Sequence, residues 1–345
     1  MKFVFTEDQL QFQDTMRGFL SQECTPDSIR SGWVDKQPLN QQRWNAIAEL
    51  GVLGANLSEE DGGLGVDQVA LALMVEEMGY VALPEPIAEQ SFLINDVLHL
   101  FPDQIQDAIR AEFNEGKEYI AVSHPQNPHP VFLSEAKGLI MIDETSCHFV
   151  KPSDVSSELI KSNDPSRVLS RILGVKNTIS SDDNFQQLNQ EINSRGTLLT
   201  ASLLLGLSQK MLDLSSAYVL DRNQFGKPIG SFQAVKHMLA DIAVAIEFAR
   251  PAVYRASYSL LETNPKSALH CAHAKYMAVK AAELACKNSI QAHGAMGYTW
   301  EMDLHIYMRK SWSLMACWGN DDYQQNIIFN TLRSSDDELG VLYTF

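Results

Sequence analysis

The sequence predicts a mainly helical protein, in which a small β module separates an N-terminal helical domain from a C-terminal four-helix bundle. Apolar residues recur at helical spacing in the first third of the chain, short β-rich runs follow, and long helical patterns resume near Asn184. A chain of 345 residues has room for two or three domains, since a domain usually runs to roughly 100–200 residues. We expect the three domains over residues 1–117, 118–185 and 186–345.

The first helix is expected to begin after Thr6, which can form a capping box with Gln9. Apolar residues at helical spacing then share one face of it, namely Phe12, Met16, Phe19 and Leu20. This pattern predicts a helix that packs one face against the core.

A second helix is expected from about Asn40 to Gly51, with Trp44 and its neighbours Ile47 and Ala48 facing inward. The glycine-rich, acidic segment 58–65 is typical of a turn. A third helix is expected over residues 67–78 and is predicted to end at Gly79, after which prolines interrupt the pattern.

The β module is predicted from three short runs rich in β-forming residues, at 119–122, 138–142 and 147–150. Prolines and other turn residues separate the runs. Beyond them, helices are expected over residues 232–261, 266–292 and 303–317 and near the C-terminus, together with a strongly apolar helical segment that ends at Asp221.

Composition excludes several functions. The net charge of −16, from 27 basic and 43 acidic residues, repels phosphate backbones, so nucleic acid is not an expected partner. No apolar run approaches the roughly 18 residues of a spanning helix, and the N-terminus lacks a secretory pattern, so we expect a cytoplasmic protein. Five scattered cysteines without a CxxC pair predict neither a disulfide framework nor a metal site.

The sharpest local pattern is the segment 221–233, Asp-Arg-Asn-Gln-Phe-Gly-Lys-Pro-Ile-Gly-Ser-Phe-Gln, between two long helices. The guanidinium of Arg222 suits phosphate oxygens, Phe225 offers a face for a ring system, and Gln233 offers an amide. Composition alone favours an ordinary interhelical loop with one exposed arginine.

A second pattern follows the next long helix, Gln-Ala-His-Gly-Ala-Met-Gly-Tyr at 291–298. Its small residues let a backbone approach a ligand closely. The alternative is a glycine-rich end of a helix.

Together, in this order and spacing, the two segments resemble the acyl-CoA dehydrogenase family. The acidic glycine turn at 59–65 and the segment 76–79, Glu-Glu-Met-Gly, are similar to that family as well. The resemblance covers most of the chain and implies FAD as cofactor and an acyl-CoA thioester as substrate, oxidised to its α,β-enoyl product. A carboxylate removes the α proton, and the β hydride passes to the flavin.

The resemblance also implies roles for particular residues. Arg222, Phe225 and Gln233 occupy positions that reach the FAD of a neighbouring subunit in the family. Gln291 and Gly294 fit the segment that contacts the adenosine diphosphate end of that FAD. These five residues are the expected cofactor-binding set.

The chain departs from the family where the base should be. Family members carry a Glu at one of two places, which correspond here to Trp318, before Gly319, and to Gly196. Neither residue is an acid, so the catalytic base is unknown, although Glu191 and Asp321 lie within a few residues of these places.

Two further departures concern the residues around the flavin. The strands that line the flavin ring in the family have no counterpart between residues 118 and 175, where the first strand ends in Ser-His-Pro. Of these residues, His124 fits a surface loop as well as a ligand. After Gly319, Asn-Asp-Asp replaces the usual Thr-x-Gln, whose side chains serve the flavin.

What remains resembles the degenerate subunit of the heteromeric acyl-CoA dehydrogenases of bacterial steroid side-chain degradation. The expected partner is a homologous chain with the catalytic Glu, the expected substrate is a bulky acyl-CoA, and the expected electron acceptor is an electron-transfer flavoprotein. Three alternatives stay open: a homomeric dehydrogenase with a relocated base, a flavin mono-oxygenase on the same fold, and a purely structural subunit.

Overall fold

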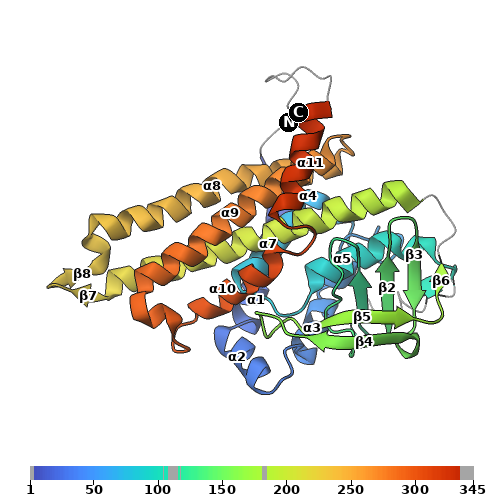
Figure 1. Ribbon diagram of the computed structural model, residues 1–345, viewed down its shortest axis with the longest axis horizontal. Coiled ribbons are helices and arrows are strands. Elements are labelled where there is room, and N and C mark those ends of the chain that lie inside the picture. The colour runs from blue at the N-terminus through green and yellow to red at the C-terminus, as the bar shows by residue number, and fades with distance from the viewer. Residues whose placement is uncertain (1–3, 104, 108–115, 117, 181–184, 335–345) are drawn as a thin grey trace.

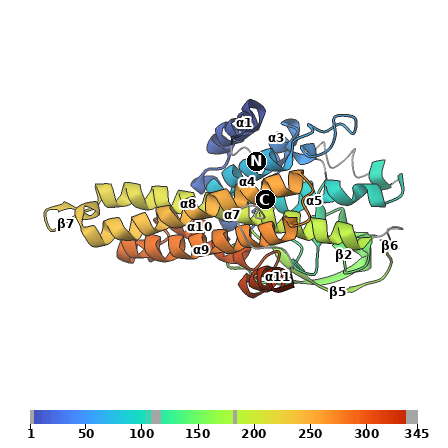
Figure 2. The same cartoon turned by 90° about the horizontal axis from the view of Figure 1, so that it is seen from above.

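The computed structural model describes residues 4–103, 105–107, 116, 118–180 and 185–334. Long helices form the middle of the molecule, the N-terminal helices lie along one side of them, and a β module lies at one end (Figures 1 and 2). A small β-hairpin forms the opposite end. One continuous cluster of buried apolar residues runs through the helical parts and the β module.

Each helix of the N-terminal part begins at a capping residue or at a proline. They are α1 (Glu7–Glu23), α2 (Pro26–Val34), α3 (Gln41–Glu49), α4 (Gln68–Tyr80) and α5 (Ile87–Val97). The capping box at Thr6 and Gln9 is present, and Asn40 caps α3. Sequence reasoning missed α2, although Thr25 and Pro26 are a cap and a first-turn proline. It also missed α5, because prolines were treated only as breakers.

The β module contains the three predicted strands and three more. The strands are β1 (Ile120–Ser123), β2 (Gly138–Ile142), β3 (Cys147–Val150), β4 (Val155–Ile160), β5 (Leu169–Val175) and β6 (Ile179–Ser180). One sheet has the order β1-β2-β3-β6, with β1 and β2 parallel and the other pairs antiparallel. A separate antiparallel pair joins β4 and β5.

The C-terminal part is built on α7 (Phe185–Asp221), α8 (Gln233–Leu261) and α9 (Ser267–His293), followed by α10 (Leu304–Met315) and α11 (Asp321–Ser334). The fold class is therefore as predicted, mainly helical with a small sheet. The expected domain boundaries near residues 117 and 185 adjoin residues outside the described ranges and stay predictions.

The prediction that Gly79 ends α4 is wrong, because the helix continues to Tyr80. The glycine instead permits close packing against α7. A Cβ on Gly79 would lie 2.2 Å from the carbonyl oxygen of Leu203, and one on Gly206 would lie 1.9 Å from that of Glu76. The two helices therefore meet backbone to backbone at paired glycines.

In the described part of the chain no helix is long and apolar enough to cross a membrane. The same residues contain no group of three or more His, Cys, Asp or Glu side chains that could hold a metal ion. All five cysteines are free.

Gly206→Ala tests the close packing of α4 and α7. Alanine normally favours a helix, but here its methyl group would overlap the carbonyl of Glu76. We expect a net loss of about 1–3 kcal/mol in the free energy of unfolding, as for other overpacked interiors. Gly18→Ala in α1 is the matched control, because a Cβ at that position would have nothing within 4 Å. Denaturant unfolding should show a gain of about 0.5–1 kcal/mol for the control; an equal gain for Gly206→Ala would contradict the packing argument.

Candidate functional site

The segment that follows α7 forms a projecting hairpin, which we call the arm (residues 222–232). Strands β7 (Asn223–Gln224) and β8 (Lys227–Pro228) pair antiparallel across a two-residue turn. Both turn residues have positive φ, 54° at Phe225 and 79° at Gly226, which is typical of a tight hairpin. Figure 1 shows the arm at the end of the molecule away from the β module.

Phe225 is the unusual residue of this turn. A non-glycine residue with positive φ is uncommon, and an aromatic ring with 91% of its surface exposed is not stabilised by burial. Its ring meets that of Phe232 edge-on, with centroids 6.1 Å apart. The turn geometry accounts for the positive φ, whereas the exposure of the ring makes Phe225 a candidate for contact with a ligand or a partner.

Arg222 is fixed through its backbone and leaves its side chain exposed. Its N–H donates to the carbonyl of Tyr218 at 2.9 Å, and its own carbonyl accepts from the N–H of Ile229 at 2.8 Å. Within the described residues its guanidinium makes no hydrogen bond or ion pair. Gln233, the first residue of α8, is exposed as well. The arm therefore presents a free cation and an amide beside an exposed ring.

Gln291 and Gly294 lie at the end of α9, on the same side of the molecule as the arm (Figure 1). Both are exposed, and Gly294 has φ 61° and ψ −138°, a conformation that is essentially restricted to glycine. Nothing lies within 4 Å of a Cβ built there, so a ligand can approach the backbone. The five residues expected to bind FAD are thus at one end of the helical bundle.

The two expected base positions meet at a single place, and an indole ring occupies it. Trp318 is fully buried, and a Cβ on Gly196 would lie 2.2 Å from its ring. On another side of the indole, the His124 ring packs at a centroid distance of 4.7 Å. We call Trp318 and His124 the plug. His124 is only 3% exposed, so its interpretation as a surface loop residue is wrong.

Hydrogen bonds fix the orientation of His124. Its Nδ1 accepts from the N–H of Gln126 at 3.0 Å, and its Nε2 lies 2.8 Å from the side-chain oxygen of Asn189. Burial lowers the pKa of His124 to about 4, so the ring is neutral near pH 7. The plug is therefore an uncharged pair of aromatic rings, tilted by 34° to one another.

The loop that carries Trp318 is held from several sides. Trp318 and Gly319 have φ of 55° and 86°. The buried ammonium of Lys275 donates to the carbonyls of Cys317 and Gly319, and burial lowers its pKa to about 8. Gln324 donates to the carbonyl of Trp318 at 2.8 Å. These contacts hold a strained loop in a position that places the indole against α7.

The loop after β1 also closes onto the plug directly. The N–H of Gly319 donates to the carbonyl of Gln126 at 3.1 Å. The residues present therefore leave no gap for a flavin ring between this loop and Trp318, so the ring half of the cofactor site does not fit FAD. The arm and the end of α9, which the resemblance assigns to a neighbour's FAD, do fit its phosphates and nucleotide.

Two buried ion pairs lie in this part of the core, one of them in contact with Cys317, the residue before Trp318. Arg167 pairs with Glu89 and also donates to the sulfur of Cys317 at 3.3 Å. The ammonium of Lys310 lies 3.7 Å from a carboxylate oxygen of Asp164. All four charged side chains are at least 94% buried. The space between α5, α7 and α10 therefore contains charges, whereas an acyl chain needs an apolar slot.

Neither displaced acid matches a catalytic base. The carboxylate of Asp321 accepts a hydrogen bond from Lys280 at 2.6 Å, at the start of α11. Glu191 is exposed on α7. A base that removes a proton from carbon needs a carboxylate close to that carbon, and neither residue lies at Trp318 or Gly196.

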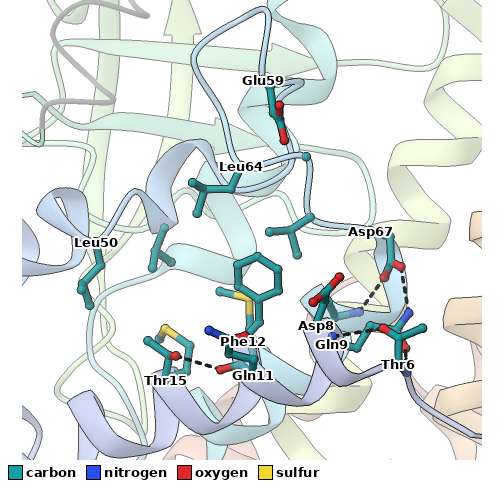
Figure 3. Close-up of a pocket in the computed structure, with 16 residues that line it drawn as sticks. Thr6, Asp8, Gln9, Gln11, Phe12, Thr15, Leu50, Glu59, Leu64 and Asp67 are labelled. Atoms are coloured by element: carbon teal, nitrogen blue, oxygen red, sulfur yellow. Dashed lines mark hydrogen bonds between the residues drawn. The ribbon is translucent and has the colours of Figure 1, made fainter.

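A cavity of about 620 Å³ lies elsewhere, between α1, the segment after α3 and the start of α4 (Figure 3). Apolar side chains line it, including Phe12, Leu50 and Leu64, and Asp8 and Glu59 line it with carboxylates. Sequence reasoning missed this site, because it assigned Phe12 to the core face of α1. Periodicity cannot distinguish a buried ring from one that lines a cavity.

Comparison with known proteins agrees with this architecture. The family model "Acyl-CoA dehydrogenase, N-terminal domain" matches residues 6–106, and "Acyl-CoA dehydrogenase, C-terminal domain" matches residues 190–332. Acyl-CoA dehydrogenase IpdE2 of Mycobacterium tuberculosis is 26% identical over 88% of this chain and 91% of its own length.

Two solved structures share the fold over nearly the whole chain. The ChsE4-ChsE5 complex from Mycobacterium tuberculosis aligns with a TM-score of 0.85 at 18% identity, covering 98% of this chain and 100% of that chain. The Tcur3481-Tcur3483 steroid ACAD aligns with a TM-score of 0.83 at 18% identity, covering 95% and 98%. The matched family models and this shared architecture lead to one conclusion: the chain belongs to the acyl-CoA dehydrogenase family, a family of oxidoreductases whose cofactor is FAD.

Proposed function

We propose that this chain is the non-catalytic subunit of a two-chain acyl-CoA dehydrogenase. It completes the FAD site of a homologous partner, which carries the catalytic Glu and oxidises a bulky acyl-CoA thioester to the α,β-enoyl product. The observation that carries the proposal is the contact between Trp318 and Gly196, which brings both base positions together without a carboxylate.

The closed pocket supports a role without chemistry of its own. Dehydrogenation requires a hydride acceptor and a base on opposite sides of the thioester. The plug fills this place, and the Arg167–Glu89 and Lys310–Asp164 pairs fill the adjoining space between helices. Because the plug fills this chain's own pocket, room for a bulky substrate must come from the partner's side.

The exposed residues of the opposite end support a role in completing another site. Two large apolar side chains are exposed there, Leu220 (70%) at the end of α7 and Phe225 (91%) in the arm. Further along α8, Val244 (54%) and Phe248 (66%) are exposed one helical turn apart. Apolar side chains that stay exposed in groups are typical of a protein interface. A partner that covers them would bring its FAD to Arg222 and Gly294.

The comparisons support the assembly and the substrate class. Two structures with this fold are each named for a pair of chains, and one of them is a steroid ACAD. A bulky acyl-CoA, of which a steroid side-chain thioester is one example, is therefore the proposed substrate.

A homomeric enzyme with a relocated base is the main alternative. It needs a carboxylate in a dry pocket beside an open flavin site. The carboxylate of Asp321 is bound by Lys280, Glu191 is exposed, and the plug occupies the pocket. These contacts favour the two-chain proposal.

FAD content tests the proposal most directly. Purified alone, the chain should be colourless, and co-expressed with a homologue that has Glu in the position of Trp318 it should give about one FAD per two chains. Arg222→Ala should then weaken FAD binding to the complex roughly 10- to 100-fold, the value of a charged hydrogen bond to phosphate. Titration of the apo-complex with FAD measures this.

The matched control for Arg222→Ala is Arg171→Ala. That arginine lies on β5 and forms an exposed pair with Glu158, so its loss should leave FAD affinity unchanged. A yellow chain with one FAD of its own, bleached by an acyl-CoA, would refute the two-chain proposal.

Trp318→Ala tests whether the indole closes a pocket or contacts substrate. If the indole only fills the pocket, its truncation to alanine should lower the free energy of unfolding by about 3–5 kcal/mol. The complex should keep its KM for acyl-CoA. Trp312→Ala, at a residue that is 44% exposed, is the control and should cost less than about 1 kcal/mol. A raised KM with unchanged stability would instead assign Trp318 to the substrate.

We also propose that an electron-transfer flavoprotein docks at the cavity of Figure 3. The apolar part of the lining suits one apolar side chain, and the carboxylates of Asp8 and Glu59 suit basic residues that flank it. A cavity that opens at the surface between α1 and α4 is also accessible to another protein.

Leu64→Lys tests this docking site, because it places an ammonium among the apolar side chains that line the cavity. The KM of the complex for electron-transfer flavoprotein should rise about 10-fold, as for loss of an anchor residue, and turnover with an artificial dye should not change. Leu159→Lys is the control at an exposed leucine on β4. Equal KM values for both variants would exclude the cavity as the docking site.

A further inference from the structure

A ring stack joins α7 to α9 beside the residues proposed to bind FAD. The rings of Tyr218 and His293 are nearly parallel, with centroids 4.2 Å apart and an interplanar angle of 21°. The hydroxyl of Tyr218 also donates to the carbonyl of His293 at 3.4 Å. This stack links the two proposed FAD-binding segments, the arm and the end of α9, because Tyr218 lies just before the first and His293 lies in the second.

On α7, Tyr218 lies one helical turn before the arm. Its carbonyl accepts from the N–H of Arg222, whose own carbonyl accepts from the N–H of Ile229 across the base of the arm. A displacement of Tyr218 would therefore move the backbone from which the guanidinium of Arg222 extends.

On α9, His293 immediately precedes Gly294. It is 4% exposed, and its Nδ1 lies 2.8 Å from the carbonyl of Ser289, so Nδ1 carries the proton. Burial lowers the pKa of His293, which keeps the ring neutral. The bond to Ser289 orients the ring along the last turn of the helix that presents Gln291.

Resting on the proposed function, we infer that Tyr218 and His293 are positioning residues that hold the two FAD-binding segments in register. Neither side chain is assigned a contact with the cofactor. The stack fixes the arm relative to the end of α9 before the cofactor binds. Without it, FAD binding would have to order the arm, and the entropy lost would weaken affinity.

The test uses the complex with the Glu-carrying partner and measures its affinity for FAD. Tyr218→Leu removes the stack and should weaken FAD binding about 10-fold, the order expected for losing an aromatic pair together with pre-organisation. Tyr218→Phe is the matched control: it keeps the ring and loses only the long hydroxyl contact, so it should remain within about twofold of wild type.

A double-mutant cycle separates positioning from a general effect on stability. If Tyr218 acts through Arg222, then Arg222→Ala should weaken FAD binding less in the Tyr218→Leu background than in the wild type. Independent, additive effects would overturn the inference. His293→Leu removes the same ring stack from the α9 side, and it replaces Tyr218→Leu in the test if that variant does not assemble with the partner. If both variants assemble, the double variant should bind FAD about as weakly as Tyr218→Leu alone.

The outcomes distinguish the inference from the proposal on which it rests. If Arg222→Ala itself leaves FAD affinity unchanged, the proposed function fails. If Arg222→Ala weakens binding, while both Tyr218→Leu and His293→Leu bind FAD as the wild type does, only the positioning role fails.

Discussion

At two glycines, helix α7 carries no side chain, so other parts of the protein pack directly against its backbone. The rest of the structure depends on these two contacts. At Gly206 the backbone of α4 lies against α7, so close that a single methyl group would not fit. At Gly196 the indole of Trp318 does the same. The first contact joins the N-terminal helices to the bundle, and the second closes the place where a substrate would need its base.

The closed pocket is stabilised by a balance of strain and hydrogen bonding. Trp318 has a backbone conformation that costs free energy for any residue except glycine. The carbonyls of Cys317 and Gly319 offset this by accepting hydrogen bonds from the buried ammonium of Lys275. A buried cation needs such acceptors, so the loop and the lysine stabilise each other. The indole and the lysine are thus both part of the buried core.

The two ends of the molecule therefore differ in what they offer a ligand. Around Trp318 the aromatic rings are buried, and the backbone carbonyls of the loop accept hydrogen bonds from Lys275 and Gln324. At the arm, the guanidinium of Arg222, the ring of Phe225 and the backbone at Gly294 are exposed. Surface that is costly to expose is retained where a partner would cover it. This asymmetry, within a single chain of the acyl-CoA dehydrogenase family, is the physical basis for assigning cofactor binding to an interface.

The sequence by itself determined the order of the three parts (helices, a small β module and long helices), the break between two long helices at 221–233 and the lack of an acid at Trp318 and Gly196. Local patterns carry this information: the capping box at Thr6 and the long apolar faces after residue 184 depend only on neighbours in the chain. It did not reveal that α4 continues past Gly79, that His124 is buried, or that Trp318 fills the space over Gly196. These outcomes depend on contacts between segments far apart in the chain, where the room left for a side chain is set by the backbone of another element. Only the tertiary structure decided them.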